Sequence, residues 1–362
     1  MAEITRQSEQ KGTMDPRSFG VGTDTRAEID RTRRRSLPIT ARIVLGRLAR
    51  IRRGHLIVLL PDGSRHTFAG SDGRAAEVVE LEIHRWRFFS RLLRRADVGA
   101  GESFVDGDWS SSNLVALTRL FLDNETELAP PNIFGTIGRF RDRLTHLLRS
   151  NTRAQARRNI HAHYDLSNQL YALFLDRSMT YSSALFDEPN LDLEAAQRRK
   201  YRRLADWAGL QPGHEVLEIG CGWGGFAEYA AGELGCRVTG ITLSEEQASF
   251  ARRRIIDAGL EDRVKIKVVD YRDVDGDFHA VISIEMLEAV GHRFLDGFFT
   301  TCDRVLRPGG RMALQTITIP DQVYDQYRRG TDWIRAYIFP GGHLPSLGAI
   351  QGLSLIHISE PT

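Results

Sequence analysis

The chain has 362 residues, of which 41% are hydrophobic and 27% charged, and its formal net charge is +2. This size and composition are typical of a globular chain with room for about two domains, and they exclude a short peptide or a disulfide-stabilised scaffold. Cys221, Cys236 and Cys302 lack the spacing of a zinc site or a disulfide framework, which favours a reducing compartment. No run approaches about 18 uncharged apolar residues, and the amino terminus has no apolar core. We therefore expect neither a membrane span nor a secretory signal, and a location in the cytoplasm.

The small net charge hides a difference between the two halves of the chain. Residues 1–160 hold 28 Lys and Arg against 19 Asp and Glu, whereas residues 161–362 hold 21 against 28. Arginines concentrate in residues 26–53 and 139–158. Such clusters attract polyanions, which could be nucleic acid or an anionic membrane face. Alternatively, the use of 45 Arg against 4 Lys indicates a genome-wide codon preference without functional meaning.

The amino-terminal part predicts a mobile basic arm over residues 1–36, followed by a small α+β domain over residues 37–125. Residues 39–51 carry Ile39, Ile43, Leu45, Leu48 and Ile51 at helical spacing. The remaining elements are a hairpin of 55–60 and 65–69 around Pro61-Asp62-Gly63, a strand over 79–83 with one buried face, and a helix from Trp86. The basic outer surface of this domain leads us to expect that it associates with lipid or membrane.

Residues 126–160 predict a linker, marked by Pro130-Pro131, and a basic helix. From Leu210 onward, apolar runs alternate with helical stretches, which is the signature of a doubly wound parallel sheet. The runs are HEVLEIG, CRVTGIT, VKIKVVD, FHAVISIE and RMALQTI. We therefore expect an α/β domain over residues 161–351.

The first strand of this domain ends in VLEIGCGWGG, with Gly220, Gly222 and Gly224 before a helix. Glycines allow a tight turn and a close approach of the backbone to a ligand at the carboxyl end of a strand. The loop differs from a dinucleotide fingerprint, because Phe226 stands near the sixth position, and no lysine follows as in a P-loop. Glu218, just before the loop, suits a ligand with a positive charge. The loop therefore points to S-adenosylmethionine.

The next two strands also end in polar residues. Ser244 and Gln247 have the spacing of a capping box, which satisfies helix amides without any ligand. The same segment brings Thr242 and Gln247 to the rim where a ribose would lie. After the third strand, Tyr271 and Arg272 would flank an adenine, unless this loop is only a solvated connection.

Several motifs occur together in one order: HAHYDLSNQLYALFLD, MTYSSALF, VLEIGCGWGGFAEYAA, GITLSEEQ, DYRD, EMLEAVG and YIFPGGHLP. Over residues 155–348 this pattern resembles the cyclopropane-fatty-acyl-phospholipid synthase family, which includes the mycolic acid cyclopropane synthases. GESFVDGDW, ending at Trp109, extends the resemblance into the amino-terminal domain. The resemblance implies a class I S-adenosylmethionine-dependent methyltransferase fold, an unsaturated phospholipid acyl chain as acceptor, and a bound bicarbonate as base.

Carried over by position, the resemblance implies a set of cofactor-binding residues and a set of catalytic residues. The cofactor-binding positions are Tyr181, Ser182, Glu218, Gly220, Cys221, Gly222, Trp223, Gly224, Thr242, Leu243, Gln247, Tyr271 and Arg272. Glu288, taken as the end of the fourth strand, matches the glutamate that holds bicarbonate, although it could also be a carboxylate favoured at a helix start. Ser183 stands where many members have cysteine, and Gln315 stands where many have histidine. Gln315 can still donate an amide hydrogen bond.

The implied chemistry requires a dry site. An isolated alkene attacks only a strong electrophile held in line, and water would capture the resulting cation. We therefore expect an enzyme that forms cyclopropane fatty acids on phospholipids. The alternatives are a same-fold methyltransferase that makes a methyl-branched chain or acts on a polar small molecule, and a membrane-associated remnant without catalysis.

The expected partners are unsaturated phospholipid and an anionic membrane surface, so that the chain would associate peripherally with the inner membrane. No nucleic-acid partner is expected, because the fourth strand does not lead into an Asn/Asp-Pro-Pro-Tyr motif. A homodimer is left open. His161, His163 and Asp165 share no helical face, so we expect no metal.

The carboxyl-terminal residues predict a truncated chain. A complete sheet of this type continues with two further strands, for which too few residues follow Gly348. Residues 352–362, ending in LIHISEPT, depart from the family pattern and resemble a translated cloning junction, so we expect a non-native tail. We expect such a chain to bind cofactor poorly and to turn over little.

Overall fold

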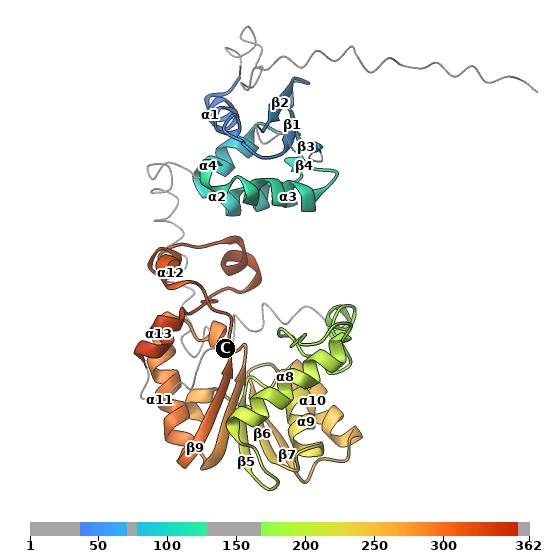
Figure 1. Ribbon diagram of the computed structural model, residues 1–362, viewed down its shortest axis with the longest axis vertical. Helices are drawn as coiled ribbons and strands as arrows, with labels where there is room; N and C mark the ends of the chain where they lie inside the picture. Colours follow the sequence, from blue (N-terminus) through green and yellow to red (C-terminus); the bar gives the residue numbers. More distant parts are fainter. Residues whose placement is uncertain (1–36, 71–77, 129–167, 354–362) are drawn as a thin grey trace, which may run out of the picture. The chain divides into compact units, whose positions relative to one another are not determined.

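The computed structural model describes residues 37–70, 78–128 and 168–353 (Figure 1). Contacts within the chain divide it into two units, Met1–Phe134 and Gly135–Thr362, which are described separately. The expected arm, most of the expected linker with its basic helix, residues 161–165 and almost all of the expected tail lie outside the described residues.

The first unit is built on a four-stranded sheet in the order β2-β1-β3-β4, in which β1 is antiparallel to β2 and parallel to β3. Its strands are β1 (His55–Leu59), β2 (Arg65–Ala69), β3 (Val78–Ile83) and β4 (Trp109–Ser110), and its helices are α1 (Ile39–Leu48), α2 (Arg87–Val105), α3 (Leu114–Asp123) and α4 (Glu125–Leu128). The predicted hairpin is confirmed, and β3 alternates exposed and buried residues as its period of two predicts.

Of the apolar residues whose spacing predicts this helix, Leu45, Leu48 and Ile51 are buried, the last of them beyond the end of α1, whereas Ile39 and Ile43 are not. The helix buries Ala41, Val44, Leu45 and Leu48. Ile39, in the first turn, is 66% exposed, and Ile43 is 38% exposed. Spacing alone could not choose between two overlapping apolar stripes, and the stripe that enters the core, where α1 packs against α2, is the one with the small Ala41. Two isoleucines therefore remain on the outer face of α1.

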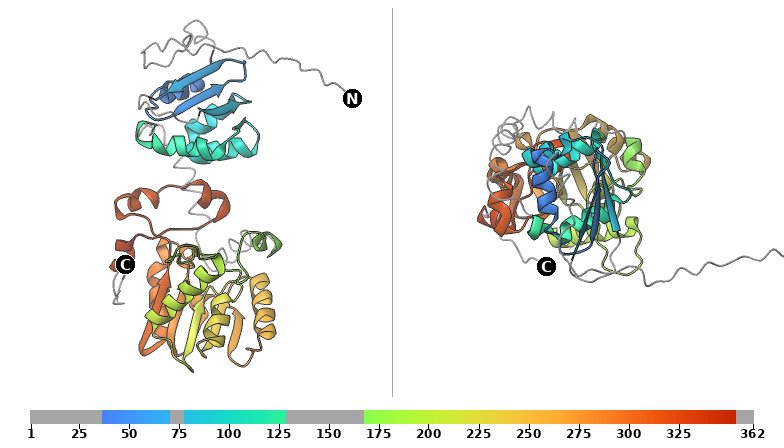
Figure 2. Two further views of the ribbon diagram at one scale, coloured as in Figure 1. Left: turned by 45° about the vertical axis from the view of Figure 1, so that its right-hand side comes forward. Right: turned by 90° about the horizontal axis from the view of Figure 1, so that it is seen from above.

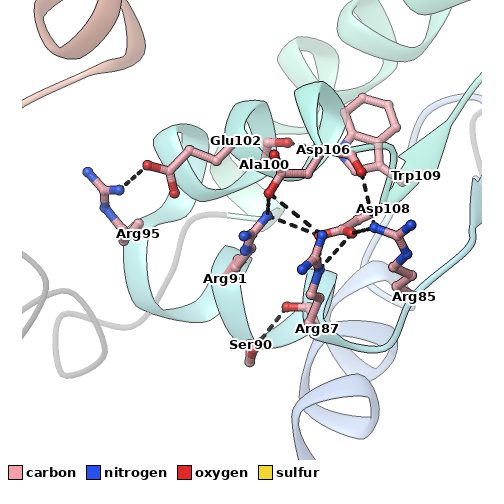
Figure 3. Close-up of polar contacts among 10 residues, drawn as sticks. All are labelled: Arg85, Arg87, Ser90, Arg91, Arg95, Ala100, Glu102, Asp106, Asp108 and Trp109. Carbon is pink, nitrogen blue, oxygen red and sulfur yellow. Dashed lines mark hydrogen bonds and ion pairs between the residues drawn. The ribbon is translucent and has the colours of Figure 1, made fainter.

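Asp108, in the GESFVDGDW motif, organises a cluster of arginines (Figure 3). Its carboxylate accepts two hydrogen bonds from Arg87 Nε, at 2.8 and 2.9 Å, and one from Arg91 Nη1 at 3.1 Å. Arg85 lies 3.4 Å from the same carboxylate, and Arg91 also pairs with Asp106 at 2.7 Å. Because two carboxylates offset two of these three positive charges, the basic surface expected on this unit depends mainly on other residues.

The second unit contains a five-stranded parallel sheet in the order β7-β6-β5-β8-β9. Its strands are β5 (Glu215–Ile219), β6 (Arg237–Thr242), β7 (Val264–Val268), β8 (Phe278–Ile284) and β9 (Leu306–Gln315). The five expected strands and their parallel arrangement are confirmed. The chain fills one side of β5 and then returns to its other side with β8, so the carboxyl ends of β5 and β8 form the switch point where open α/β sheets bind ligands.

Helices cover both faces of this sheet (Figures 1 and 2). Helices α8 (Leu193–Ala208), α9 (Gly225–Gly232) and α10 (Glu245–Asp257) pack on one face, and α11 (Leu295–Val305) packs on the other. The shorter helices α7 (Asn168–Ala172), α12 (Asp321–Tyr327) and α13 (Leu347–Gly352) lie in the connections. This layered core is the doubly wound fold that the alternating pattern predicts.

The described ranges offer neither a helix suited to spanning a membrane nor a cluster suited to holding a metal ion. No helix there combines the length and the apolar character that a membrane span requires. No group of three or more His, Cys, Asp or Glu side chains in the same ranges is placed to hold a metal ion. His161, His163 and Asp165 lie outside them.

Candidate active site

The loop after β5 turns sharply at the switch point of the sheet. Gly220 has φ +83°, and a Cβ at this position would lie 2.7 Å from Met286 Cγ. The amides of Gly220 and Cys221 both donate to the Ile241 carbonyl, at 3.0 and 2.9 Å. The loop is therefore held against β6 on one side and Met286 on the other, which only glycine permits here.

A cavity opens beside this loop and brings together most of the predicted cofactor-binding positions. Those that line it are Tyr181, Ser182, Glu218, Gly220, Cys221, Gly222, Trp223, Thr242, Leu243, Gln247 and Tyr271. Gly224 and Arg272 do not line it. Further lining residues that the sequence did not single out include Met179, Thr180, Tyr201, Ile284, Glu285, Met286 and Ala289.

Glu218 is the most perturbed acid of the cavity. Glu218 is 3% exposed, and its Oε2 has no hydrogen-bond partner. Burial raises the pKa of Glu218 to about 8, although the nearby Lys200 and the Ala227 amide act in the opposite direction. A cationic ligand would supply the partner that this buried carboxylate oxygen lacks.

Thr242 and Gln247 form a hydrogen-bonded rim after β6. The predicted cap is only half present, because the Gln247 amide donates to Ser244 Oγ at 3.2 Å but the Gln247 side chain does not return to Ser244. Thr242 Oγ1 instead accepts from the Ser244 amide at 3.2 Å and donates to Gln247 Oε1 at 2.8 Å. This network fixes both side chains at the cavity wall.

Tyr271 and Arg272 follow β7 in a short 3-10 turn, Tyr271–Asp273. Burial raises the pKa of Tyr271 to about 12, and its ring lines the cavity. Arg272 pairs instead with Asp270, at 2.8 Å from Nε to Oδ1 and 2.6 Å from Nη2 to Oδ2, and lies over the Tyr271 ring. The structure thus assigns Arg272 a contact with the ring rather than with the cavity.

The three predicted catalytic residues lie around, but not in, the lining of this cavity. Ser183 and Gln315 both hydrogen-bond Glu285, an acid that the sequence analysis did not name. The position of Glu285 in the sequence could have identified it, because it directly follows the last residue of β8 at the edge of the sheet where ligands bind.

Glu288 lies beyond the strand rather than at its end. It belongs to a 3-10 turn, Leu287–Ala289, and its Oε1 accepts hydrogen bonds from Thr316 Oγ1 and the Ile317 amide. Burial raises the pKa of Glu288, and its Oε2 has no partner. Its contacts tie the connections that follow β8 and β9 together.

Aromatic side chains gather at one side of the cavity. The Tyr181 ring contacts Tyr171 at 5.2 Å, Phe174 at 6.3 Å and Phe339 at 6.4 Å between centroids. Tyr171 is buried against Trp223, whereas Phe174 is 54% exposed and Phe339 is 37% exposed. An apolar surface therefore adjoins a cavity with a buried acid.

Comparisons with known proteins agree with this arrangement. A family model described as mycolic acid cyclopropane synthetase matches residues 151–357. The tuberculostearic acid methyltransferase UfaA1 of Mycobacterium tuberculosis is 39% identical over 352 residues, which is 94% of this chain and 80% of the relative. The cyclopropane-fatty-acyl-phospholipid synthase of Escherichia coli is 36% identical over 77% of this chain and 70% of the relative.

Solved structures give the same result. The cyclopropane synthase MmaA2 from Mycobacterium tuberculosis is 32% identical with a TM-score of 0.51, over 54% of this chain and 72% of the other. The mycolic acid cyclopropane synthase CmaA1, complexed with SAH and CTAB, is 32% identical with a TM-score of 0.50 and the same coverage. The chain therefore belongs to the mycolic acid cyclopropane synthetase family and is an S-adenosylmethionine-dependent methyltransferase of the cyclopropane synthase type.

Proposed function

We propose that this chain transfers a methylene group from S-adenosylmethionine to the cis double bond of an unsaturated phospholipid acyl chain, forming a cyclopropane fatty acid. The observation that carries the proposal is one cavity lined both by Glu218, with its unpartnered carboxylate oxygen, and by Tyr181, whose ring begins an exposed aromatic cluster. A cationic donor suits the first feature, and an apolar chain suits the second. The name of the Escherichia coli relative supports the same acceptor.

The residues that line the cavity fit S-adenosylmethionine. Glu218 would compensate a positive charge, Thr242 and Gln247 would contact the ribose, and the Tyr271 ring would flank the adenine. When bound, the cofactor supplies an electrophilic methyl group on a sulfonium sulfur. The chain contributes the position of that group beside the aromatic cluster, where an alkene can approach it and water is displaced.

Bicarbonate, which the family resemblance implies, does not fit this site in the same way. Two of the three groups carried over for it, Ser183 and Gln315, already donate to Glu285 Oε1. The third, Glu288, accepts from Thr316 and Ile317 through Oε1, so that its Oε2 alone lacks a partner. Our proposal therefore includes no step that depends on bicarbonate.

A methyl-branched or methylene-bearing acyl chain is the second candidate product. The relative that aligns with 94% of this chain is named for tuberculostearic acid rather than for a cyclopropane. Both products would start from the same methyl transfer to an alkene. Loss of a proton from the transferred methyl group closes the ring, loss of a proton from a neighbouring chain carbon gives a methyl-branched alkene, and a methylene group would first require a 1,2-hydride shift. The first step is thus common to the two candidates.

The proposal is tested by a single-turnover reaction with the 362-residue protein in excess over methyl-labelled S-adenosylmethionine. The acceptor is a vesicle of phospholipid with a monounsaturated acyl chain, and the matched control is a saturated phospholipid. We expect label in the fatty acids of the unsaturated vesicle alone, and mass analysis after double-bond cleavage separates a ring from a branched alkene. Transfer to neither vesicle would contradict the proposal.

We further propose that the outer face of α1 attaches the chain to an anionic membrane surface. Ile39, Arg42 and Ile43 lie on the exposed face of α1, and Arg50 and Arg53 are exposed beyond the end of the helix. Apolar side chains flanked by arginines favour the membrane interface, since each basic residue near an anionic surface contributes about 1 kcal/mol.

This attachment is tested by vesicle flotation with anionic and neutral phospholipids. Replacing Arg42 and Arg50 by glutamine should reduce binding to anionic vesicles roughly tenfold or more, given that energy for each residue. Arg119, exposed on α3 of the same unit, provides the control substitution. Binding should weaken as salt rises. Equal binding to duplex DNA with a steep salt slope would instead favour a nucleic-acid partner.

A further inference from the structure

Glu285 accepts hydrogen bonds from two of the three residues that the family resemblance assigns to bicarbonate. Its Oε1 accepts three hydrogen bonds, from the Ser183 amide at 2.9 Å, from Ser183 Oγ at 2.8 Å and from Gln315 Nε2 at 2.9 Å. Ser183 and Gln315 are the two positions at which this chain departs from the pattern of cysteine and histidine. The two departures are therefore parts of one arrangement, whose third part is a carboxylate of the chain itself.

The second oxygen of Glu285 is left for another partner. All hydrogen bonds of this carboxylate within the described ranges go to Oε1, and none goes to Oε2. Glu285 lines the cavity together with Tyr181 and Met286. The pKa of Tyr181 is raised by burial and, to a smaller extent, by the negative charge of Glu285, as expected for neighbours. One oxygen is held in place while the other remains able to accept a proton.

The backbone at Glu285 adopts a conformation that a glutamate adopts only at a cost. Its φ is +47°, in the left-handed region, and its amide donates to the Gln315 carbonyl at 2.8 Å. The chain thus extends the pairing of β8 with β9 by one residue and then turns. Backbone strain of this kind persists where the surrounding structure enforces it, and it is frequent in active sites.

We propose that Glu285 is the catalytic base of this chain and replaces bicarbonate in the reaction. This inference rests on the proposed function. After methyl transfer to the double bond, the acyl chain carries a cationic carbon, and Glu285 Oε2 takes a proton from the transferred methyl group. The C–H bond breaks, its electron pair forms the C–C bond that closes the ring, and the proton on Oε2 is later released to water. If the proton is taken from the adjacent chain carbon instead, the same pair forms a double bond.

Two variants separate this role from a structural one. Glu285→Gln keeps an oxygen that accepts hydrogen bonds from Ser183 and Gln315 but removes the base. Glu285→Gly removes the side chain at a φ that glycine tolerates, and it leaves space for a small anion. Glu261→Gln is the matched control, because Glu261 is exposed in the turn before β7, at the opposite end of the strands.

The experiment measures single-turnover product formation in carbon-dioxide-free buffer, with and without added bicarbonate or formate. We expect product formation by the wild type to be the same with and without bicarbonate. Glu285→Gln should form product about 100-fold more slowly, or should yield a hydroxylated chain because water captures the cation. Glu285→Gly should regain product formation when formate or bicarbonate is added. In calorimetry, the affinity of both variants for S-adenosylmethionine should differ from that of the wild type by less than about threefold, because a residue that only transfers a proton does not hold the cofactor.

Each other outcome counts against the inference. A wild type that requires bicarbonate, or a Glu285→Gln variant with unchanged rate and product, would overturn it. Loss of product in Glu285→Gln without anion rescue of Glu285→Gly would show a positioning residue instead of a base. If the wild type transfers no label to any lipid, the proposed function fails, and this is distinguishable because the wild-type measurement precedes every variant.

Discussion

The buried carboxylate of Glu218 makes the stability of the ligand-free protein depend on pH. Its pKa is raised to about 8 in the folded chain, against an ordinary value of 4.5. The folded state therefore holds a proton that the unfolded state releases, and stability falls as pH rises between these two values. Glu218→Gln has a similar volume and no charge, so this variant removes that dependence.

The size of the effect follows from the two pKa values. At 1.36 kcal/mol for each factor of ten, the penalty for Glu218 is about 1 kcal/mol near pH 5, about 3 kcal/mol near pH 7 and about 4 kcal/mol near pH 8. Glu218→Gln should be more stable than the wild type by these amounts. Groups that do not interact with Glu218 are common to both proteins and cancel in the difference.

Urea unfolding of both proteins at several pH values measures this difference directly. The substitution should have the opposite effect on ligand affinity. Because the variant loses a charged acceptor, it should bind S-adenosylmethionine about 10- to 100-fold more weakly than the wild type. The wild type should also release close to one proton on binding near pH 7, which calorimetry in buffers of different ionisation enthalpy detects. A stability difference that stays constant from pH 5 to pH 8 would refute the reasoning.

Three further substitutions test other parts of the fold. Asn124→Ala removes four hydrogen bonds to Arg52, Arg53 and Leu120, at 2.8 to 3.0 Å, and should lower the free energy of unfolding of the first unit by about 3 kcal/mol; a loss below 1 kcal/mol in urea unfolding would contradict this. Asp108→Ala leaves Arg85, Arg87 and Arg91 without their buried partner (Figure 3) and should cost about 2 kcal/mol or more in the same assay. Gly220→Ala should weaken cofactor binding about tenfold more than Gly222→Ala, as measured by calorimetry. A Cβ meets Met286 only at position 220, and this steric conflict costs roughly 1 to 3 kcal/mol. Equal losses of affinity in the two variants would show that the conflict does not matter.

The sequence predicted those parts of the fold that depend on local pattern. The turn at residues 61–63, the alternation of β3 and the cap at Ser244 each follow from residues within a few positions of one another. The five parallel strands follow from the same kind of signal repeated along the chain. Local patterns carry this information because hydrogen bonding and burial repeat with the period of the element.

The register of α1 could not be predicted in this way. Both the stripe containing Ile39 and Ile43 and the stripe containing Ala41 and Val44 are apolar. The choice between them depends on the core that the helix meets, where it packs against α2, and a single sequence does not contain that contact. Arg272 shows the same limit on a smaller scale, because its pairing with Asp270 and the Tyr271 ring competes with the ligand contact that the motif implied.

The candidate site was only partly predictable for a related reason. Residues at the ends of β5, β6 and β7 were found because site residues gather at the carboxyl edge of a parallel sheet. Ser183 and Gln315, however, were two unrelated departures from a family pattern until the fold brought them to Glu285. Ser183 is 102 positions from Glu285, and Gln315 is 30 positions away. Compensation between such distant positions is visible only in three dimensions.

The strain at Glu285 provides a last prediction that does not depend on activity. At an ordinary position, alanine is more stable than glycine by about 0.4 to 1 kcal/mol, because glycine gives the unfolded chain more freedom. At φ +47° the order should reverse, since left-handed backbone costs a residue with a Cβ about 1 to 2 kcal/mol. Both Glu285→Gly and Glu285→Ala lose the same carboxylate and the same hydrogen bonds, so their difference isolates the backbone.

We therefore expect Glu285→Gly to have a free energy of unfolding about 1 kcal/mol higher than Glu285→Ala. The comparison requires only urea unfolding of two inactive variants. If alanine were the more stable residue, the chain would not be held in the left-handed region at this position, and the orientation that we assign to the Glu285 carboxylate would lose its support. If glycine is the more stable, the fold tolerates strain at the residue to which Ser183 and Gln315 donate, as expected for a residue retained for its chemistry.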